Sequence, residues 1–353
     1  MAKRGLEVDK VAAVLRHTDN KSGWSICIGA GTSLPVLYDW YSLVGNLIND
    51  NCSASVKIDI NTYRNMGFSA DAMIQAVKNI LGLDDKDFVM LLSEAVYSPI
   101  KEKVTSNQWK SFCKIHETIN PAQIKKSEWL DLSYIKDTLL METSANLLAE
   151  VVVEAIQNNI EPKAILTFNG ESLFHSLLNY YYYFVHKIDK KAKFDKIINS
   201  ICKRTIMRIP YIHCHGVIPI NGIKTRKGRN AIDKIVFSED SYLQIANNSF
   251  SWQATSFIEN CLNSKIVFIG VSLTDANMRR WLSWVHSNKI NELKENGIKF
   301  ENSTDHYWIN KTPSSVQEKI WIEETVSHLG IRLVWIDDWN QTGIVLRKML
   351  NLK

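Results

Sequence analysis

Short apolar runs alternate along the chain with longer segments in which apolar residues recur at helical spacing. Runs of this kind, bounded by glycine or polar residues, are typical of strands buried on both faces. They predict strands at residues 26–28, 163–169, 211–215, 265–273, 306–310 and 331–337. The segments with helical spacing predict helices at residues 171–187, 275–286, 314–328 and 339–350. This alternation predicts an α/β fold with a Rossmann-like, doubly wound parallel sheet.

The strand pattern is absent between residues 51 and 160. Three stretches there, DAMIQAVKNILG, DKDFVMLLSEAV and ETSANLLAEVVVEAI, have apolar residues at helical spacing. We interpret residues 51–160 as a mainly helical insertion within one domain that spans residues 1–353. Because the insertion follows the first strand and its helix, we expect it near the carboxyl edge of the sheet, where open α/β folds bind ligands.

The first predicted strand runs directly into a glycine turn. Its residues are Gly29, Ala30, Gly31, Thr32 and Ser33. Pro35 follows and is expected to begin a helix, since proline suits a first helical turn. A bare backbone turn before a helix can approach a diphosphate, which favours nucleotide binding. Leu34 stands where the dinucleotide fingerprint has its third glycine, so the turn could also simply join two packed elements.

Two more strand ends carry candidate chemistry. Asn169 ends the second strand and Glu171 follows it; the amide is expected to face the ligand crevice or, alternatively, to cap the next helix. His213 and His215 alternate along a strand and so share one face. His215 is a candidate general base, whereas a structural role is the default for His213. The two histidines could also bind a metal ion, which leaves a metal-dependent hydrolase as one alternative.

A second glycine turn follows the strand at residues 265–273. It runs from Gly270 to Ser272, and Asp275 stands near the start of the next helix. A second bare turn facing the first would hold the other half of a dinucleotide. Asp275 could instead serve only the helix, because an acidic residue there is favourable to the helix dipole.

Composition narrows the class of protein. The chain has 353 residues, of which 45% are apolar and 22% charged, as in ordinary globular proteins. It has no apolar run near the roughly 18 residues of a membrane span and no apolar leader, so we expect a cytoplasmic protein without membrane contact. The six cysteines form no C-x-x-C pair and are expected to be reduced thiols. The net charge of +5 is small, and the basic stretch at residues 224–230 is expected to be solvated, without direct nucleic-acid binding.

Taken in order, four stretches resemble the sirtuin-like (silent information regulator-like) superfamily. They are the turn Gly29–Ser33, Asn169, His215 with its following glycine, and GVSLTDANMRR. The chain is similar to the bacterial anti-phage defence branch of NAD hydrolases more than to the protein deacetylases. It lacks the four-cysteine zinc module of the deacetylases, and LYDWYSL stands in place of their Pro-Asp-Phe-Arg motif.

The resemblance implies hydrolysis of NAD to nicotinamide and ADP-ribose. It implies that Asn169 holds a water or the ribose hydroxyls and that His215 accepts a proton. Asp39 and Glu171 are further candidates at the site, Glu171 standing where the family usually has aspartate. The glycine turn at residues 29–33, Gly270 and Ser272 are expected around the diphosphate, with Asp275 touching the ligand or orienting its turn.

The resemblance also implies a biological role. NAD would be the substrate, with no other cofactor and no metal required, and its depletion would serve antiviral defence. We expect a homo-oligomer whose trigger is a separately encoded defence partner or a phage-derived component. The alternative from a different class is a non-catalytic sensor that binds NAD or ADP-ribose and assembles with a partner.

Overall fold

The computed structural model describes most of the chain. The described residues are 4–16, 21–118, 120–189, 191–202, 204–220, 235–246, 248, 250–298 and 304–352, so the basic stretch at 224–230 lies outside them. They form one eight-stranded sheet in the order β1-β8-β7-β6-β2-β3-β5-β4, and every pair of neighbours is parallel. The strands are β1 (Leu6–Glu7), β2 (Trp24–Ile28), β3 (Ile165–Thr167), β4 (Phe194–Ile197), β5 (Ile209–His213), β6 (Lys265–Ile269), β7 (His306–Lys311) and β8 (Ile331–Ile336). The predicted α/β, Rossmann-like fold class is confirmed.

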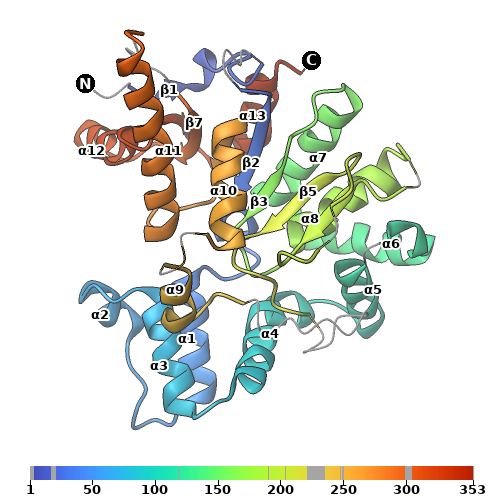
Figure 1. Ribbon diagram of the computed structural model, residues 1–353. Helices are drawn as coiled ribbons and strands as arrows, with labels where there is room; N and C mark the ends of the chain where they lie inside the picture. The colour runs from blue at the N-terminus through green and yellow to red at the C-terminus, as the bar shows by residue number, and fades with distance from the viewer. Residues whose placement is uncertain are drawn as a thin grey trace.

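Helices cover both faces of the sheet (Figure 1). Helices α7 (Ser144–Gln157), α8 (Leu173–Asn179) and α13 (Thr342–Leu350) pack on one face, and α10 (Trp252–Asn263), α11 (Ala276–Glu295) and α12 (Val316–Ser327) pack on the other. Side chains alternate between these two layers: Ile26 and Ile28 join one apolar cluster, and Cys27 joins the other. Burial on both faces explains why the central strands read as continuous apolar runs.

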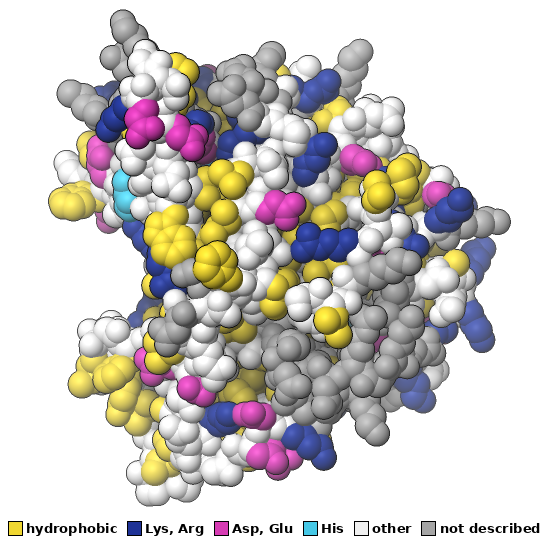
Figure 2. Space-filling view, in the orientation of Figure 1, with side chains coloured by type: hydrophobic (Ala, Val, Ile, Leu, Met, Phe, Trp, Pro, Cys, Tyr) yellow, Lys and Arg dark blue, Asp and Glu magenta, His cyan; other side chains and the backbone are white. Residues whose placement is uncertain are grey.

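Helices alone fill the described chain between β2 and β3. They are α1 (Trp40–Asn51), α2 (Ile60–Asn65), α3 (Ala70–Leu81), α4 (Asp85–Lys101), α5 (Ser106–Glu117), α6 (Lys126–Ile135) and α7, with a π-helical segment at Lys136–Leu140. Helices α1 to α4 gather below the sheet together with α9 (Glu239–Ala246), which packs against α3 (Figure 1). The surface is indented between this group and the α10–α11 layer (Figure 2). No described helix is long and apolar enough to cross a membrane.

Some local expectations differ from the structure. Pro35 does not begin a helix: residues Ala30–Ser33 form a 3-10 turn, the Leu34–Pro35 peptide is cis, and α1 starts only at Trp40. The edge strands β1 and β4 were not predicted, because their short stretches contain the charged residues Glu7, Asp195 and Lys196. The expected helix at 171–187 is α8 continued by a π-helical segment at Tyr180–Val185. All six cysteines are buried, and their reduced state stays a prediction.

The strand order reverses at β2, which lies between β3 and β6. The chain proceeds from β2 to β3 on one side and returns later to β6 on the other. The residues that follow these strands, beginning with Gly29, Phe168 and Gly270, therefore meet at one edge of the sheet. Open α/β sheets bind ligands in the crevice at such a reversal.

Candidate active site

A pocket lies at the carboxyl ends of β2 and β3, against α1 and α4. Three polar side chains, Ser33, Asn169 and Glu171, line it. Its largely apolar wall is formed by Leu37, Tyr38, Trp40, Leu43, Val96 and Ile218. The cavity has a volume of about 30 Å3, room for about one or two water molecules. An apolar, aromatic wall with a few converging polar groups suits a planar ligand that carries a polar substituent, and the pocket must widen to admit one.

Glu171 links the glycine turn to Asn169. Its Oε1 accepts from Ser33 Oγ at 2.9 Å and from Asn169 Nδ2 at 2.8 Å, and its Oε2 accepts from the backbone N–H of Leu173. Burial raises the pKa of the Glu171 carboxyl, although the three hydrogen bonds and the charge of Lys196 act in the opposite direction. The pocket wall therefore holds a carboxyl group that is fixed on both oxygens.

Asn169 presents an unsatisfied acceptor. The residue is 2% exposed, and its backbone N–H donates to Thr167 Oγ1 at 3.0 Å. Its Oδ1 is buried and accepts no hydrogen bond from any described group. The bond from Nδ2 to Glu171 sets the amide orientation, because the flipped amide would turn Oδ1 toward a carboxylate oxygen. Ser172, rather than Asn169, stands at the cap position of α8, so helix capping does not account for Asn169.

The two glycine turns are in direct contact. The N–H of Gly31 donates to the Gly270 carbonyl at 3.0 Å, and the N–H of Gly29 donates to the Ile269 carbonyl at 3.0 Å. A Cβ on Gly29 would lie 2.4 Å from the Gly270 oxygen, so only glycine permits this approach. The N–H groups of Gly29 and Gly31 therefore already have hydrogen-bond acceptors within the protein. The prediction that the whole turn offers free N–H groups to a phosphate does not hold for these two residues.

Replacing Gly270 by alanine is expected to destabilise the protein by at least about 2 kcal/mol. Gly270 has φ +65°, and its Cβ would lie 2.5 Å from the backbone nitrogen of Thr32. Gly297→Ala is the matched control, because Gly297 has φ +66° and a Cβ there would meet no heavy atom of another described residue within 4 Å. Urea unfolding measures both variants. Equal losses of stability would contradict the close packing of the two turns.

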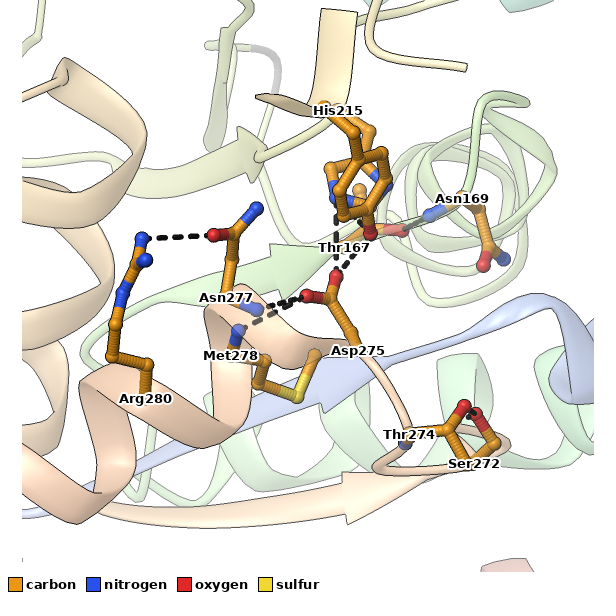
Figure 3. Close-up of polar contacts among 10 residues, drawn as sticks. Thr167, Asn169, His215, Ser272, Thr274, Asp275, Asn277, Met278 and Arg280 are labelled. Atoms are coloured by element: carbon orange, nitrogen blue, oxygen red, sulfur yellow. Dashed lines mark hydrogen bonds and ion pairs between the residues drawn. The ribbon is translucent and has the colours of Figure 1, made fainter. Parts of the chain in front are cut away.

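His215 and Asp275 form a second polar cluster together with Tyr242. His215 Nε2 lies 3.1 Å from the Tyr242 hydroxyl and 3.4 Å from Asp275 Oδ2. The Tyr242 hydroxyl also donates to Asp275 Oδ2. Figure 3 shows the side chains of His215 and Asp275 directed toward one another, with Asn169 to one side. His215 comes from the turn after β5, Tyr242 from α9, and Asp275 from the loop before α11.

Asp275 serves both α11 and the cluster. Its Oδ1 accepts from the backbone N–H groups of Asn277 at 2.8 Å and Met278 at 3.0 Å, which caps the helix. Burial alone would raise the pKa of the Asp275 carboxyl. The hydrogen bond and charge of His215, with those from Tyr242 and Met278, outweigh burial and hold this pKa below its usual value. Asp275 is therefore a fixed carboxylate beside the imidazole.

Phe237 packs against both the pocket residue Trp40 and His215. It is 3% exposed, and its ring centroid lies 4.8 Å from that of Trp40 and 6.5 Å from that of His215. It also packs on the bare backbone of Gly170, where a Cβ would meet its ring at 2.2 Å. The structure thus brings Ser33, Asn169 and Glu171 together in the pocket, whereas His215 does not line it.

Comparison with known protein families matches a part of the chain that includes residues at this edge of the sheet. Residues 163–329 match the family model described as SIR2-like domain. This part of the chain, a little under half of its length, is thus similar to a SIR2-like domain. The matched residues include Asn169, His215 and Asp275 and leave out the turn at Gly29–Ser33. Domains of this family use NAD as substrate. No curated protein matches the chain in sequence.

Three other predicted residues of the site have local partners. Asp39 is exposed and caps α1, accepting from the Ser42 N–H at 2.7 Å. Ser272 is exposed, and its hydroxyl lies 2.7 Å from that of Thr274, as Figure 3 shows. Thr32 is buried, and its hydroxyl donates to the Gly29 carbonyl at 2.8 Å. Asp39 does not line the pocket, whereas Ala30 does.

His213 and His215 have different surroundings. His213 is the last residue of β5 and is fully buried, with Nε2 at 3.4 Å from Ser172 Oγ. His215 lies beyond the strand end and packs at 4.8 Å on Phe168. The expected shared strand face is therefore wrong. Within the described residues, no three His, Cys, Asp or Glu side chains are placed to hold a metal ion.

Sequence reasoning missed Tyr242 and Phe237. Both lie in a stretch after residue 234 that reads VFSEDSYLQIA, where the spacing indicates at most a short helix. Nothing in that pattern indicates that this tyrosine or this phenylalanine lies near the candidate active site. Their position depends on the packing of α9 against α3, a long-range contact that no local sequence pattern predicts.

Proposed function

We propose that the SIR2-like domain hydrolyses NAD to nicotinamide and ADP-ribose. Water supplies the oxygen of the new bond to ribose C1, the nicotinamide leaves with the electron pair of the broken bond, and one proton is released. The observation that supports this most is the buried, unsatisfied Oδ1 of Asn169 in a pocket at the strand-order reversal. An unpaired buried acceptor costs about 1–3 kcal/mol, which a donor from bound ligand or water recovers.

Asn169 and Glu171 suit the reacting end of NAD. The transition state of this cleavage resembles an oxocarbenium ion, so a nearby carboxylate and an oriented oxygen stabilise it. Asn169 Oδ1 can accept from a ribose hydroxyl or from the attacking water. The Glu171 carboxylate lies directly behind the amide and fixes it at 2.8 Å. The aromatic wall at Trp40 offers a surface for the nicotinamide ring.

His215 is the proposed proton acceptor. It lies at the same sheet edge, held by Asp275, and imidazole is the side chain suited to proton transfer near neutral pH. For His215 and Asn169 to reach one ribose, we infer that Phe237, which packs on Gly170 and has its ring centroid 6.5 Å from that of His215, must move. We therefore propose that the Phe237 side chain is displaced when NAD binds.

The proposed biological role is depletion of NAD as an effector of antiviral defence in the cytoplasm. It rests on the resemblance of the four motifs to the defence branch. A homo-oligomer fits this role, with a separately encoded defence partner or a phage-derived trigger that sets when the enzyme assembles. We propose no contact with membrane or nucleic acid.

Chromatography of NAD incubated with the purified protein tests the proposal. Several protein concentrations are used so that activity that depends on assembly of the oligomer is detected. Parallel samples contain a chelator to test for a required metal ion. Nicotinamide and ADP-ribose in equal amounts, with or without chelator, are expected. Saturable NAD binding without turnover would favour the sensor, and loss of activity with chelator would favour a metal-dependent hydrolase.

A further inference from the structure

The His215 imidazole is held from three sides. Phe168 packs against it at 4.8 Å with the rings nearly perpendicular, at 85°. Tyr242 packs at 5.1 Å between centroids and places its hydroxyl 3.1 Å from Nε2. Asp275 Oδ2 lies 3.4 Å from the same nitrogen. No described residue forms a hydrogen bond with Nδ1 of His215. This nitrogen is also not one of the buried side-chain atoms that lack a hydrogen-bond partner.

The proton positions follow from these contacts. The hydroxyl hydrogen of Tyr242 points to Asp275, so its oxygen is left with lone pairs toward Nε2. Both neighbours of Nε2 are then acceptors, which requires that Nε2 carry the proton. A neutral imidazole with its proton on Nε2 has its lone pair on Nδ1.

We propose that Tyr242 is a positioning residue that, together with Asp275, holds His215 in the Nε2–H tautomer and leaves Nδ1 as the proton acceptor. This inference rests on the proposed NAD hydrolysis. The proton taken up at Nδ1 comes from a ribose hydroxyl or the attacking water, and the carboxylate of Asp275 balances the charge of the imidazolium. The Tyr242 hydroxyl is engaged by His215 and Asp275, so it acts through these two side chains and not on substrate.

The electrostatic surroundings support a protonated tyrosine. Burial, and then the charge of Asp275, raise the pKa of the Tyr242 hydroxyl well above its ordinary value, so the hydroxyl remains a donor. The other titratable groups that act on it are Asp71 of α3 and Cys214. Burial also raises the pKa of the Cys214 thiol, which stays neutral beside the cluster. Asp275 is thus the charged partner nearest to the imidazole.

Nitrogen-15 NMR of histidine-labelled protein reads the tautomer directly and does not depend on any activity. The chain has nine histidines, and the spectrum of His215→Ala identifies the signals of His215. The parent protein is expected to show the Nε2–H tautomer of His215. In Tyr242→Phe the two tautomers are expected to mix, because only Asp275 remains to select Nε2–H. An Nδ1–H tautomer in the parent would overturn the proposal even if the variant failed to fold.

Steady-state kinetics give the second readout. For Tyr242→Phe we expect kcat for NAD cleavage to fall about 10- to 100-fold, as when a group that orients a catalytic side chain is lost, with KM unchanged. Tyr181→Phe is the matched control, because Tyr181 is buried and its hydroxyl donates to Asn146 at 2.9 Å, away from the cluster. It is expected to keep the parental kcat and the parental His215 tautomer.

The two readouts separate the two proposals. If the parent protein cleaves no NAD, the proposed function fails, and the tautomer spectra still decide the role of Tyr242. If the parent cleaves NAD and Tyr242→Phe has parental kcat and an unchanged His215 spectrum, the positioning role fails alone. A rise in KM with parental kcat would also reject it, because Tyr242 would then act on substrate binding.

Discussion

His215→Ala is expected to lower NAD cleavage by about 100- to 10,000-fold, the usual contribution of a general base. The variant removes the only imidazole that the described residues place beside Asp275 at the carboxyl edge of β5. Asp275 still caps α11 through Asn277 and Met278, so the fold around the helix start is expected to persist. Nicotinamide release at saturating NAD measures the effect.

The control for this variant is His328→Ala. His328 is exposed at the end of α12 and is expected to retain parental activity. Circular dichroism establishes that both variants are folded. A folded His215→Ala protein with parental turnover would remove His215 from the mechanism and leave proton transfer to water or to Glu171.

Asn169→Ala is expected to lower turnover by about 100- to 1,000-fold, in the range found when one preorganised polar group is removed from a buried site. The change deletes the unpaired Oδ1 and also the donor that Glu171 accepts from at 2.8 Å. The reacting ribose then loses its oriented oxygen, and Glu171 loses a bond that lowers its pKa. Initial rates over a range of NAD concentrations separate loss of turnover from loss of binding.

Asn146→Ala is the matched control for Asn169. Asn146 is 5% exposed on α7, and its Oδ1 accepts from the Tyr181 hydroxyl at 2.9 Å. Its loss removes a buried amide of the same kind without touching the pocket. Similar losses of turnover in both variants would mean that Asn169 matters only for stability.

The central fold could be predicted because its strands are buried on both faces. The strand Trp24–Ile28 has no exposed face, so the apolar run Ile26–Ile28 is evident in the sequence. The edge strand Phe194–Ile197 pairs with β5 alone and carries Asp195 and Lys196. Its pattern therefore lacks the signal on which the prediction depends.

Parts of the candidate site could be predicted because strand ends are fixed by register. Ile28 pairs with both Thr167 and Ile269, so the residues after these strands must meet at one edge. Which side chains then share a pocket depends on long-range packing. Ser33 reaches Glu171 across 138 residues of sequence, and Trp40 packs on Phe237 across a still longer separation.

The role of the first glycine turn shows the limit of motif reasoning. The turn at residues 29–33 was expected to offer its backbone N–H groups to a diphosphate. The structure shows that Gly29 and Gly31 also have a packing role, since the second turn approaches them within hydrogen-bond distance at Gly270. A glycine that permits close packing and a glycine that admits a ligand look the same in one sequence.

The most direct test of NAD hydrolysis is the mass of the ADP-ribose formed in water enriched in oxygen-18. The purified protein is incubated with NAD over a range of protein concentrations, and the products are separated and weighed by mass spectrometry. Hydrolysis predicts nicotinamide together with ADP-ribose that carries one heavy oxygen at ribose C1. NAD that is bound but still intact at every concentration would contradict the account.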